Sequence, residues 1–158
     1  MAALWLPDLL DRRANLFDAD RLELLRCPSP MTGGKAVRMR VLIVDDHAVI
    51  RAALSSMLSQ EADIEIVGEA GDGKVAVEMA RELLPDVILM DINMPVMNGI
   101  DATRAIRAEF STVQVIGLSM SQHVEQAQPM LDAGAAGYVC KTEAPDVLLK
   151  AIRRCATA

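Results

Sequence analysis

Short apolar runs alternate with amphipathic stretches along most of this chain. Runs typical of strands cover residues 41–44, 64–70, 87–91, 113–118 and 137–140. Each is followed by a segment with apolar residues at helical spacing, at residues 48–59, 73–84, 98–110, 122–133 and 145–155. Because a helical crossover returns the chain to the same end of a sheet, this alternation predicts one α/β domain with a five-stranded parallel sheet.

The fourth amphipathic segment departs from this pattern because Pro129 lies inside it. A proline within a helix removes one backbone hydrogen bond and costs about 3 kcal/mol or more. We therefore expect this helix to be kinked, or to be short and to begin near Pro129.

Residues 1–38 differ from the rest of the chain. Their leucines indicate one or two short amphipathic helices, and a cluster of Pro, Ser and Gly at residues 28–34 is typical of a linker. Met39 resembles the start of a complete domain. We therefore predict a domain over residues 39–158, preceded by an N-terminal extension over residues 1–38 that is either part of an upstream unit, a partner-binding arm or an artificial addition.

Composition and charge narrow the classes of function. The 158 residues suffice for one well-buried domain and a short appendage. A net charge of −6 and a pI near 4.9 argue against direct binding to nucleic acid or to an anionic membrane, which require clustered positive charge. No apolar run approaches the roughly 20 residues that span a bilayer. Three cysteines without CxxC spacing (Cys27, Cys140 and Cys155) fit a reducing cytoplasm better than a disulfide framework.

Polar residues lie at the carboxyl ends of four of the five predicted strands. Since the carboxyl ends of parallel strands meet at one edge of a sheet, this edge should bring together Asp45, Asp46, Asp91, Ser119 and Lys141. Each residue alone has an ordinary structural explanation, because Asp starts turns and caps helices, Ser ends strands and Lys is usually solvated. Their coincidence at one edge indicates a functional site.

Three carboxylates in one crevice repel one another, by roughly 4 kcal/mol for a pair at about 4 Å and an effective dielectric constant near 20. A proton or a divalent cation relieves this repulsion. Carboxylate, carbonyl and water oxygens suit Mg²⁺, whereas Zn²⁺ favours His and Cys. His47 follows the acidic pair, but a lone histidine at a helix start is more typical of a solvated first-turn residue than of a metal ligand.

A metal-bound carboxylate that faces a lysine and a hydroxyl is suited to receive a phosphoryl group. Asp91 would act as the nucleophile, and the metal and Lys141 would neutralise charge on the phosphoryl oxygens. Ser119 would donate a hydrogen bond to one of these oxygens. The product would be an aspartyl phosphate.

Four motifs resemble the receiver domain of two-component response regulators, over about residues 39–155. They are Leu42-Ile-Val-Asp45-Asp46-His47, Asp91-Ile-Asn-Met-Pro95-Val-Met-Asn-Gly99, Ser119 and Gly137-Tyr138-Val-Cys-Lys141. The resemblance implies a flavodoxin-like (βα)5 doubly wound sheet with strand order 2-1-3-4-5. His47, the glycines at 134 and 137, and Thr142 in place of a proline are similar to the NarL/FixJ-type subgroup, which usually carries a helix-turn-helix output domain.

The resemblance implies a role for each matching position. Asp91 corresponds to the phosphoacceptor, and Mg²⁺ is the implied cofactor. The residues implied to hold this ion are Asp46 directly, Asp45 largely through water, Asp91, and Asn93 through its backbone carbonyl. Ser119 and Lys141 would hold the phosphoryl group. Tyr138 matches the aromatic switch residue, whose rotation would change the surface of the fourth helix, fifth strand and fifth helix.

The implied partner is a sensor histidine kinase or a phosphotransfer protein that donates the phosphoryl group from a phosphohistidine, and a homodimer is compatible with this role. Such a domain catalyses its own phosphorylation and dephosphorylation and is not a turnover enzyme. No DNA-reading element is expected within residues 1–158. The chain is then a shortened form, a stand-alone receiver, or the receiver end of a hybrid sensor kinase, where it would act as a docking or inhibitory module.

Three other classes of protein share part of this pattern. A haloacid dehalogenase-type enzyme also uses a strand-end Asp with Mg²⁺, but it needs a second Asp two residues later on its first strand and a longer chain. A nucleotide or flavin binder would use the glycines of residues 68–73, whose order is not GxGxxG and suits ordinary turns. A receiver that is not phosphorylated would lack an acidic or lysine position, and none is missing.

Overall fold

Strands and helices alternate throughout the computed structural model, which describes residues 37–120 and 124–155. The strands are β1 (Met39–Val44), β2 (Ile64–Ala70), β3 (Val87–Asp91), β4 (Gln114–Ser119) and β5 (Gly137–Cys140). The helices are α1 (Ala48–Leu58), α2 (Gly73–Leu83), α3 (Gly99–Glu109), α4 (Val124–Asp132) and α5 (Pro145–Cys155). The helices expected in the N-terminal extension lie outside the described residues and stay a prediction.

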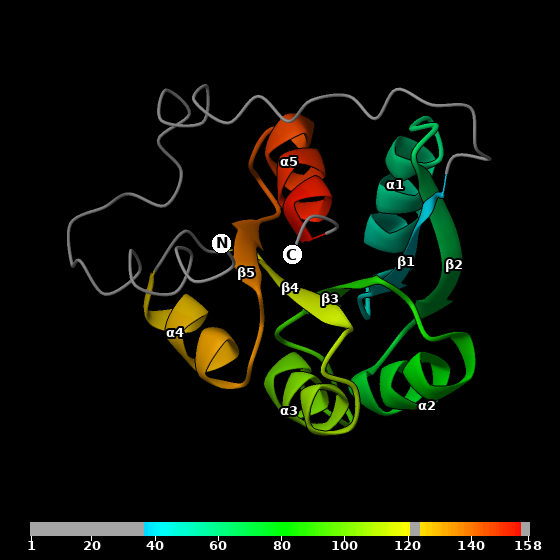
Figure 1. Cartoon of the computed structure of the whole chain (residues 1–158). Helices are drawn as coiled ribbons and strands as arrows, with labels where there is room; N and C mark the ends of the chain where they lie inside the picture. The colour runs from blue at the N-terminus through cyan, green and yellow to red at the C-terminus, as the bar shows by residue number, and fades with distance from the viewer. Residues whose placement is uncertain (1–36, 121–123, 156–158) are drawn as a thin grey trace. The chain divides into compact units, whose positions relative to one another are not determined.

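The strands form one parallel sheet in the order β2-β1-β3-β4-β5, which confirms the predicted flavodoxin-like topology. Helices cover both faces of this sheet. Figure 1 shows α1 and α5 on one face and α2, α3 and α4 on the other. This arrangement leaves the two ends of the strands as the edges at which loops, and therefore functional side chains, gather.

The core explains why the central strand reads as an uninterrupted apolar run. All five residues of β3 are buried, as expected for a strand that is covered on both faces. Alternate residues of each strand face α1 and α5, and this cluster includes Val41, Ile43, Val87, Leu89, Ile116, Leu118 and Val139. The intervening residues face the other layer. Leu42, for example, lies with Met79 and Leu83 of α2 around Gly68.

Of the two alternatives expected for the fourth helix, a start near Pro129 is wrong, and a kink at Pro129 stays a prediction. The helix α4 begins at Val124, five residues earlier, although its nine residues make it shorter than the eleven-residue α3. Ala127, Met130 and Ala133 are buried and share one face of this segment. Their burial against the sheet offsets the cost of the proline, which tertiary packing commonly does for helix propensity.

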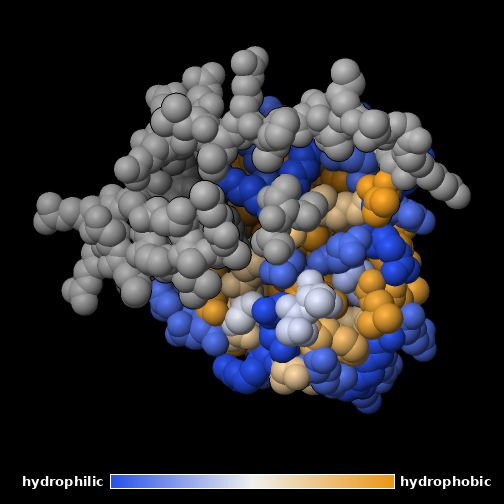
Figure 2. Space-filling view, in the orientation of Figure 1, coloured by the Kyte–Doolittle hydropathy of each residue, from blue (hydrophilic) through white to orange (hydrophobic). Residues whose placement is uncertain are grey.

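The described surface is mixed in polarity. Figure 2 shows hydrophilic residues over much of the visible described surface, with hydrophobic residues in smaller patches between them. In residues 37–120 and 124–155, no helix combines the length and the apolar character needed to cross a bilayer.

Candidate functional site

The carboxyl edge of the sheet brings four predicted site residues into one buried cluster. Asp91 is the last residue of β3 and Ser119 the last of β4, while Asp45 and Lys141 directly follow β1 and β5. Asp45, Asp91 and Ser119 are 0%, 4% and 2% exposed. The backbone N–H of Lys141 donates to the Ser119 carbonyl at 2.7 Å, which holds the ends of β4 and β5 together. The predicted meeting of these residues is confirmed.

Lys141 joins two carboxylates from different strands. Its Nζ lies 2.8 Å from Asp91 Oδ1 and also pairs with Asp45 Oδ2, and its side chain is only 8% exposed. Burial works to lower the pKa of Lys141, but the hydrogen bonds to Asp45 and Asp91 outweigh this effect and the pKa is raised. The lysine is therefore charged at neutral pH and compensates part of the negative charge of the cluster.

Burial also sets the acidity of Asp91. Desolvation raises the pKa of its carboxyl above the ordinary value, and the hydrogen bond and charge of Lys141 oppose that shift. Lys141 thus favours the ionised form of the carboxylate, whereas burial favours the protonated form. A nucleophilic role for Asp91 needs this ionised form.

Asp46 and His47 form the more exposed side of the cluster, at the start of α1. Asp46 Oδ1 is a buried atom without a hydrogen bond in the described part of the chain, although His47 Nδ1 lies 2.8 Å away. His47 Nδ1 and Asp46 Oδ1 are therefore within ion-pair distance, but their geometry does not satisfy that of a hydrogen bond. His47 is 64% exposed at its side chain, as predicted for a first-turn residue, yet its ring nitrogen faces the carboxylates.

The acidic side chains are close enough to share a cation. One ligand atom from each of Asp45, Asp46, His47 and Asp91 lies within 4.8 Å of all the others. Three carboxylates, one of which has a buried oxygen without a hydrogen-bond partner among the described residues, fit a hard divalent cation such as Mg²⁺. Asn93 is exposed in the loop two residues after Asp91, and the contribution of its backbone carbonyl stays a prediction.

Gly99 allows the first turn of α3 to approach the backbone of Asp91. A Cβ atom at Gly99 would lie 1.9 Å from the Asp91 carbonyl oxygen, and the Gly99 N–H donates to the Ile92 carbonyl at 2.9 Å. Asn98 caps the same helix by accepting from the Asp101 N–H at 2.9 Å. The Asn-Gly pair therefore fixes the segment that carries Asp91, a role that the sequence signals only as a glycine at a helix start.

Comparison with known proteins agrees with this geometry. Residues 41–153 match the response regulator receiver domain family. The chain belongs to this family. It is 42% identical over 119 residues to the nitrate/nitrite response regulator protein NarP of Escherichia coli strain K12, covering 75% of this chain and 55% of that protein. It is 43% identical over 115 residues to the transcriptional regulatory protein LiaR of Bacillus subtilis strain 168, covering 73% and 54%.

Solved structures give the same result. The signal receiver domain of the putative response regulator NarL from Mycobacterium tuberculosis superposes with a TM-score of 0.73 at 33% identity, covering 77% of this chain and 98% of that one. The relatives confirm the predicted NarL/FixJ-type resemblance. This receiver domain therefore has the general role of its family, phosphoryl acceptance in two-component signalling. The chain spans about half the length of the curated relatives that it matches.

Arg51 is a receiver-domain residue that sequence reasoning missed. Its Nη1 donates to the Asp45 carbonyl at 2.7 Å, and its Nε lies 3.6 Å from Glu69 Oε2 on β2. The side chain thereby ties α1 to the backbone of the acidic pair. An arginine on an amphipathic helix reads as an ordinary solvated residue, so only the tertiary structure reveals this contact.

Tyr138, the predicted switch residue, is buried beside α4. It is 4% exposed and pairs with Gly117 across β4 and β5. Its Cδ2 lies 3.4 Å from the position that a Cβ on Gly117 would occupy, and Met130 Cγ of α4 lies 2.7 Å from the same position. The ring is therefore packed where the fifth strand meets the fourth helix.

Proposed function

We propose that Asp91 accepts a phosphoryl group from the phosphohistidine of a sensor histidine kinase or a phosphotransfer protein, in a Mg²⁺-dependent reaction. The observation that carries this proposal is the 2.8 Å contact of Asp91 Oδ1 with the buried Lys141 ammonium, beside two further carboxylates. The proposed receiver unit covers residues 39–158 and follows the extension over residues 1–38. The match to the family over residues 41–153 supports these limits.

The reaction is a transfer between two protein side chains. An Asp91 carboxylate oxygen forms a bond to phosphorus as the bond from phosphorus to the donor imidazole nitrogen breaks, and the leaving imidazole takes up a proton from solvent. Mg²⁺, when bound, neutralises charge on the phosphoryl oxygens. Its proposed ligands are the side chains of Asp45, Asp46 and Asp91 and the backbone carbonyl of Asn93.

Lys141 and Ser119 stabilise the transferred group. The Lys141 ammonium lies against the Asp91 oxygen and is positioned to pair with a phosphoryl oxygen there. The Ser119 hydroxyl, buried at the end of β4, donates a hydrogen bond to another phosphoryl oxygen. The chain thus catalyses its own modification once and does not turn over a substrate.

Signalling follows from the position of Ser119 between the site and the Tyr138 region. A hydrogen bond from Ser119 to the phosphoryl group draws the loop after β4 toward Asp91. Tyr138 then rotates, and the surface of α4, β5 and α5 changes. The packing of Tyr138 and Met130 around Gly117 supports this route, because a movement at β4 alters the contacts of both side chains.

The rim of the site supports a protein as the phosphoryl donor. Val49, Val96 and Met120 are 82%, 83% and 65% exposed, and they lie shortly after Asp46, Asp91 and Ser119 in the chain. Exposed apolar side chains around a charged centre are typical of surfaces that contact other proteins.

Acetyl phosphate with Mg²⁺ tests the reaction without the kinase. Intact-mass measurement should show the gain of one phosphoryl group in the wild-type protein. The gain should disappear in Asp91→Asn, which removes the nucleophile, and in Asp46→Ala, which removes a metal ligand. Asp146→Asn, a change of an exposed aspartate on α5, is the matched control and should leave the gain intact. A gain that persists in Asp91→Asn would refute the proposed acceptor.

A further inference from the structure

The imidazole of His47 is turned toward the acidic residues by a hydrogen-bond contact with Asp45 and an ion-pair contact with Asp46, and not by helix capping. Its Nδ1 lies 2.8 Å from Asp46 Oδ1 and 3.2 Å from Asp45 Oδ1, although the side chain is 64% exposed and has room to point into solvent. His47 occupies the N-cap position of α1 but makes no side-chain capping hydrogen bond. Its imidazole is turned toward the acidic residues instead.

Asp45 and Asp46 differ in the number of other partners that their carboxylate oxygens have. Asp45 Oδ1 already accepts from the backbone N–H of His47 at 2.8 Å, and Asp45 Oδ2 pairs with Lys141. Asp46 Oδ1 is a buried atom that has no hydrogen-bond partner within residues 37–120 and 124–155. The His47 ring nitrogen and this carboxylate oxygen thus lie within ion-pair distance, in a geometry that does not satisfy a hydrogen bond.

The spacing of these atoms suits a shared cation. Two ligands that bind an ion at right angles, each at about 2.1 Å, are about 3 Å apart. The separations of 2.8 and 3.2 Å between His47 Nδ1 and the two carboxylate oxygens are close to this value. All four ligand atoms, including that of Asp91, lie within 4.8 Å of one another.

We propose that His47 supplies a nitrogen ligand to the divalent cation of this site, so that the receiver binds Mn²⁺ and related transition metals more tightly than three carboxylates alone would. The inference rests on the proposed function, because it assumes a cation at the acidic cluster. Mg²⁺ prefers oxygen ligands, whereas imidazole suits ions later in the first transition row. His47 therefore changes the choice of metal more than it changes the binding of Mg²⁺.

Pulsed electron paramagnetic resonance on the full chain loaded with Mn²⁺ tests this ligand directly. The wild-type protein should show the ¹⁴N modulation of a coordinated imidazole, and His47→Asn should lose it. His123, the other histidine of the chain, gives the matched control His123→Asn, which should keep the modulation. Asparagine is a good N-cap, and His47→Gln offers a second variant if the first alters the helix.

Metal affinity gives an independent readout. Titration of free Mn²⁺ should show at least about tenfold weaker binding in His47→Asn, and competition should show a smaller change for Mg²⁺. The wild-type protein could bind Mn²⁺ without imidazole modulation and lose this binding in Asp46→Ala. That result would overturn the role of His47 and leave the proposed acceptor site standing. Mn²⁺ binding that survives both Asp46→Ala and Asp91→Asn would overturn the metal site itself, and the inference with it.

Discussion

Val96 adopts a backbone conformation that its side chain disfavours. Its φ is +68°, and the Met97 N–H donates to the Pro95 carbonyl at 2.8 Å, so the three residues form a tight turn in the loop after Asp91. Positive φ is unusual for a β-branched residue and stores roughly 1–3 kcal/mol. The side chain is 83% exposed, so no burial compensates for this strain.

Replacement of Val96 by glycine should therefore stabilise the domain. Relief of strain exceeds the roughly 0.5–1 kcal/mol that glycine loses through the flexibility of the unfolded chain, so we expect a gain of about 1 kcal/mol in the free energy of unfolding. Urea unfolding measures this gain. Val96→Ala is the control, because it retains a Cβ at positive φ and should gain less. A glycine variant no more stable than the alanine variant would show that the turn is unstrained.

Residues of the site divide into those that the sequence reveals and those that it hides. Asp45, Asp91 and Lys141 were predictable because strand periodicity fixes which residues reach the carboxyl edge. The contacts of His47 and Arg51 were not, because they depend on side-chain directions at the start of a helix. The periodicity that predicts α1 gives no information on whether a polar side chain turns toward solvent or toward a neighbouring strand end.

At the scale of the elements, apolar periodicity predicted the existence of every strand and helix of the described chain. The bounds differ slightly, because β1 begins two residues before the expected strand 41–44 and β4 is displaced by one residue from the expected strand 113–118. The start of α4 was wrong for a specific reason. Helix propensity includes the hydrogen bond that Pro129 removes. It does not include the burial of Ala127 and Met130, because that burial depends on contacts with other parts of the chain.

The helix α4 should gain stability when its proline is replaced. Pro129 is exposed, so Pro129→Ala removes no buried contact and restores an N–H donor to the carbonyl of Glu125. The expected gain is about 2 kcal/mol, the cost of an internal proline less the entropy that proline removes from the unfolded chain. Hydrogen exchange of peptides that cover α4 should slow accordingly.

Pro145→Ala provides the matched control for this change. Pro145 is the first residue of α5, a position where the missing N–H would have no partner within the helix. Its replacement should leave exchange in α5 unchanged or slightly faster. Equal slowing in both variants would mean that Pro129 does not weaken α4 in particular.

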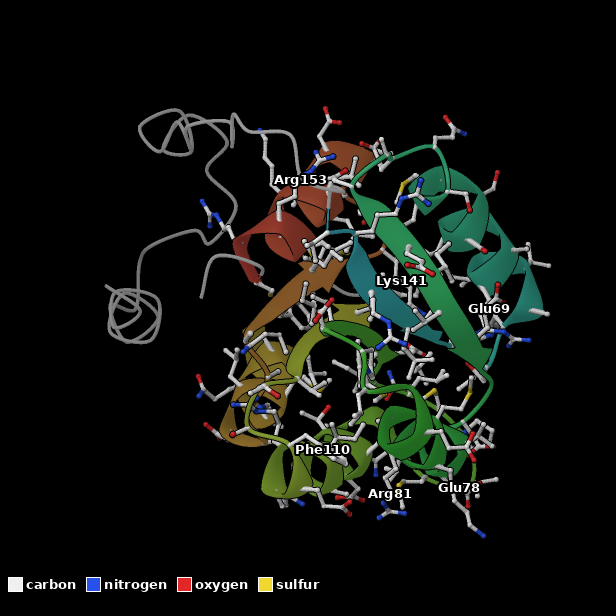
Figure 3. The ribbon with its side chains drawn as sticks, turned by 45° about the vertical axis from the view of Figure 1, so that its right-hand side comes forward. Glu69, Glu78, Arg81, Phe110, Lys141 and Arg153 are labelled. Carbon is white, nitrogen blue, oxygen red and sulfur yellow. The ribbon has the colours of Figure 1, made fainter. Side chains whose placement is uncertain are left out.

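At the scale of the whole molecule, one arginine connects parts of the chain that are far apart in sequence. Arg153 on α5, labelled in Figure 3, donates to Asp63 at 2.7 and 2.9 Å and to Glu61 at 2.7 Å. Both acids lie in the connection between α1 and β2. A two-bond arginine contact with one carboxylate is stronger than most surface ion pairs, so it contributes to the alignment of α5 with that connection.

This contact predicts a pH dependence of global stability. The hydrogen bonds from Arg153 lower the pKa of Asp63 below its ordinary value of 3.8, so the folded protein binds this proton more weakly than the unfolded chain does. The stabilisation is therefore fully present above about pH 4 and is lost as the pH falls through the lower folded-state pKa. Asp63 is 49% exposed at its side chain, and solvent limits the contribution to about 1 kcal/mol or less.

Urea unfolding of the wild type and Asp63→Asn at several pH values isolates this contribution. The variant should be less stable at pH 6, and the difference in the free energy of unfolding between the two proteins should be smaller at pH 3. The difference between the two free energies of unfolding does not include the titration of the buried carboxylates around Lys141, because both proteins retain these carboxylates. Glu65→Gln, at an exposed glutamate on β2, should show no comparable pH-dependent difference from the wild type. If the Asp63→Asn difference were the same at both pH values, the arginine would stabilise the fold through packing of its side chain rather than through the charge of Asp63.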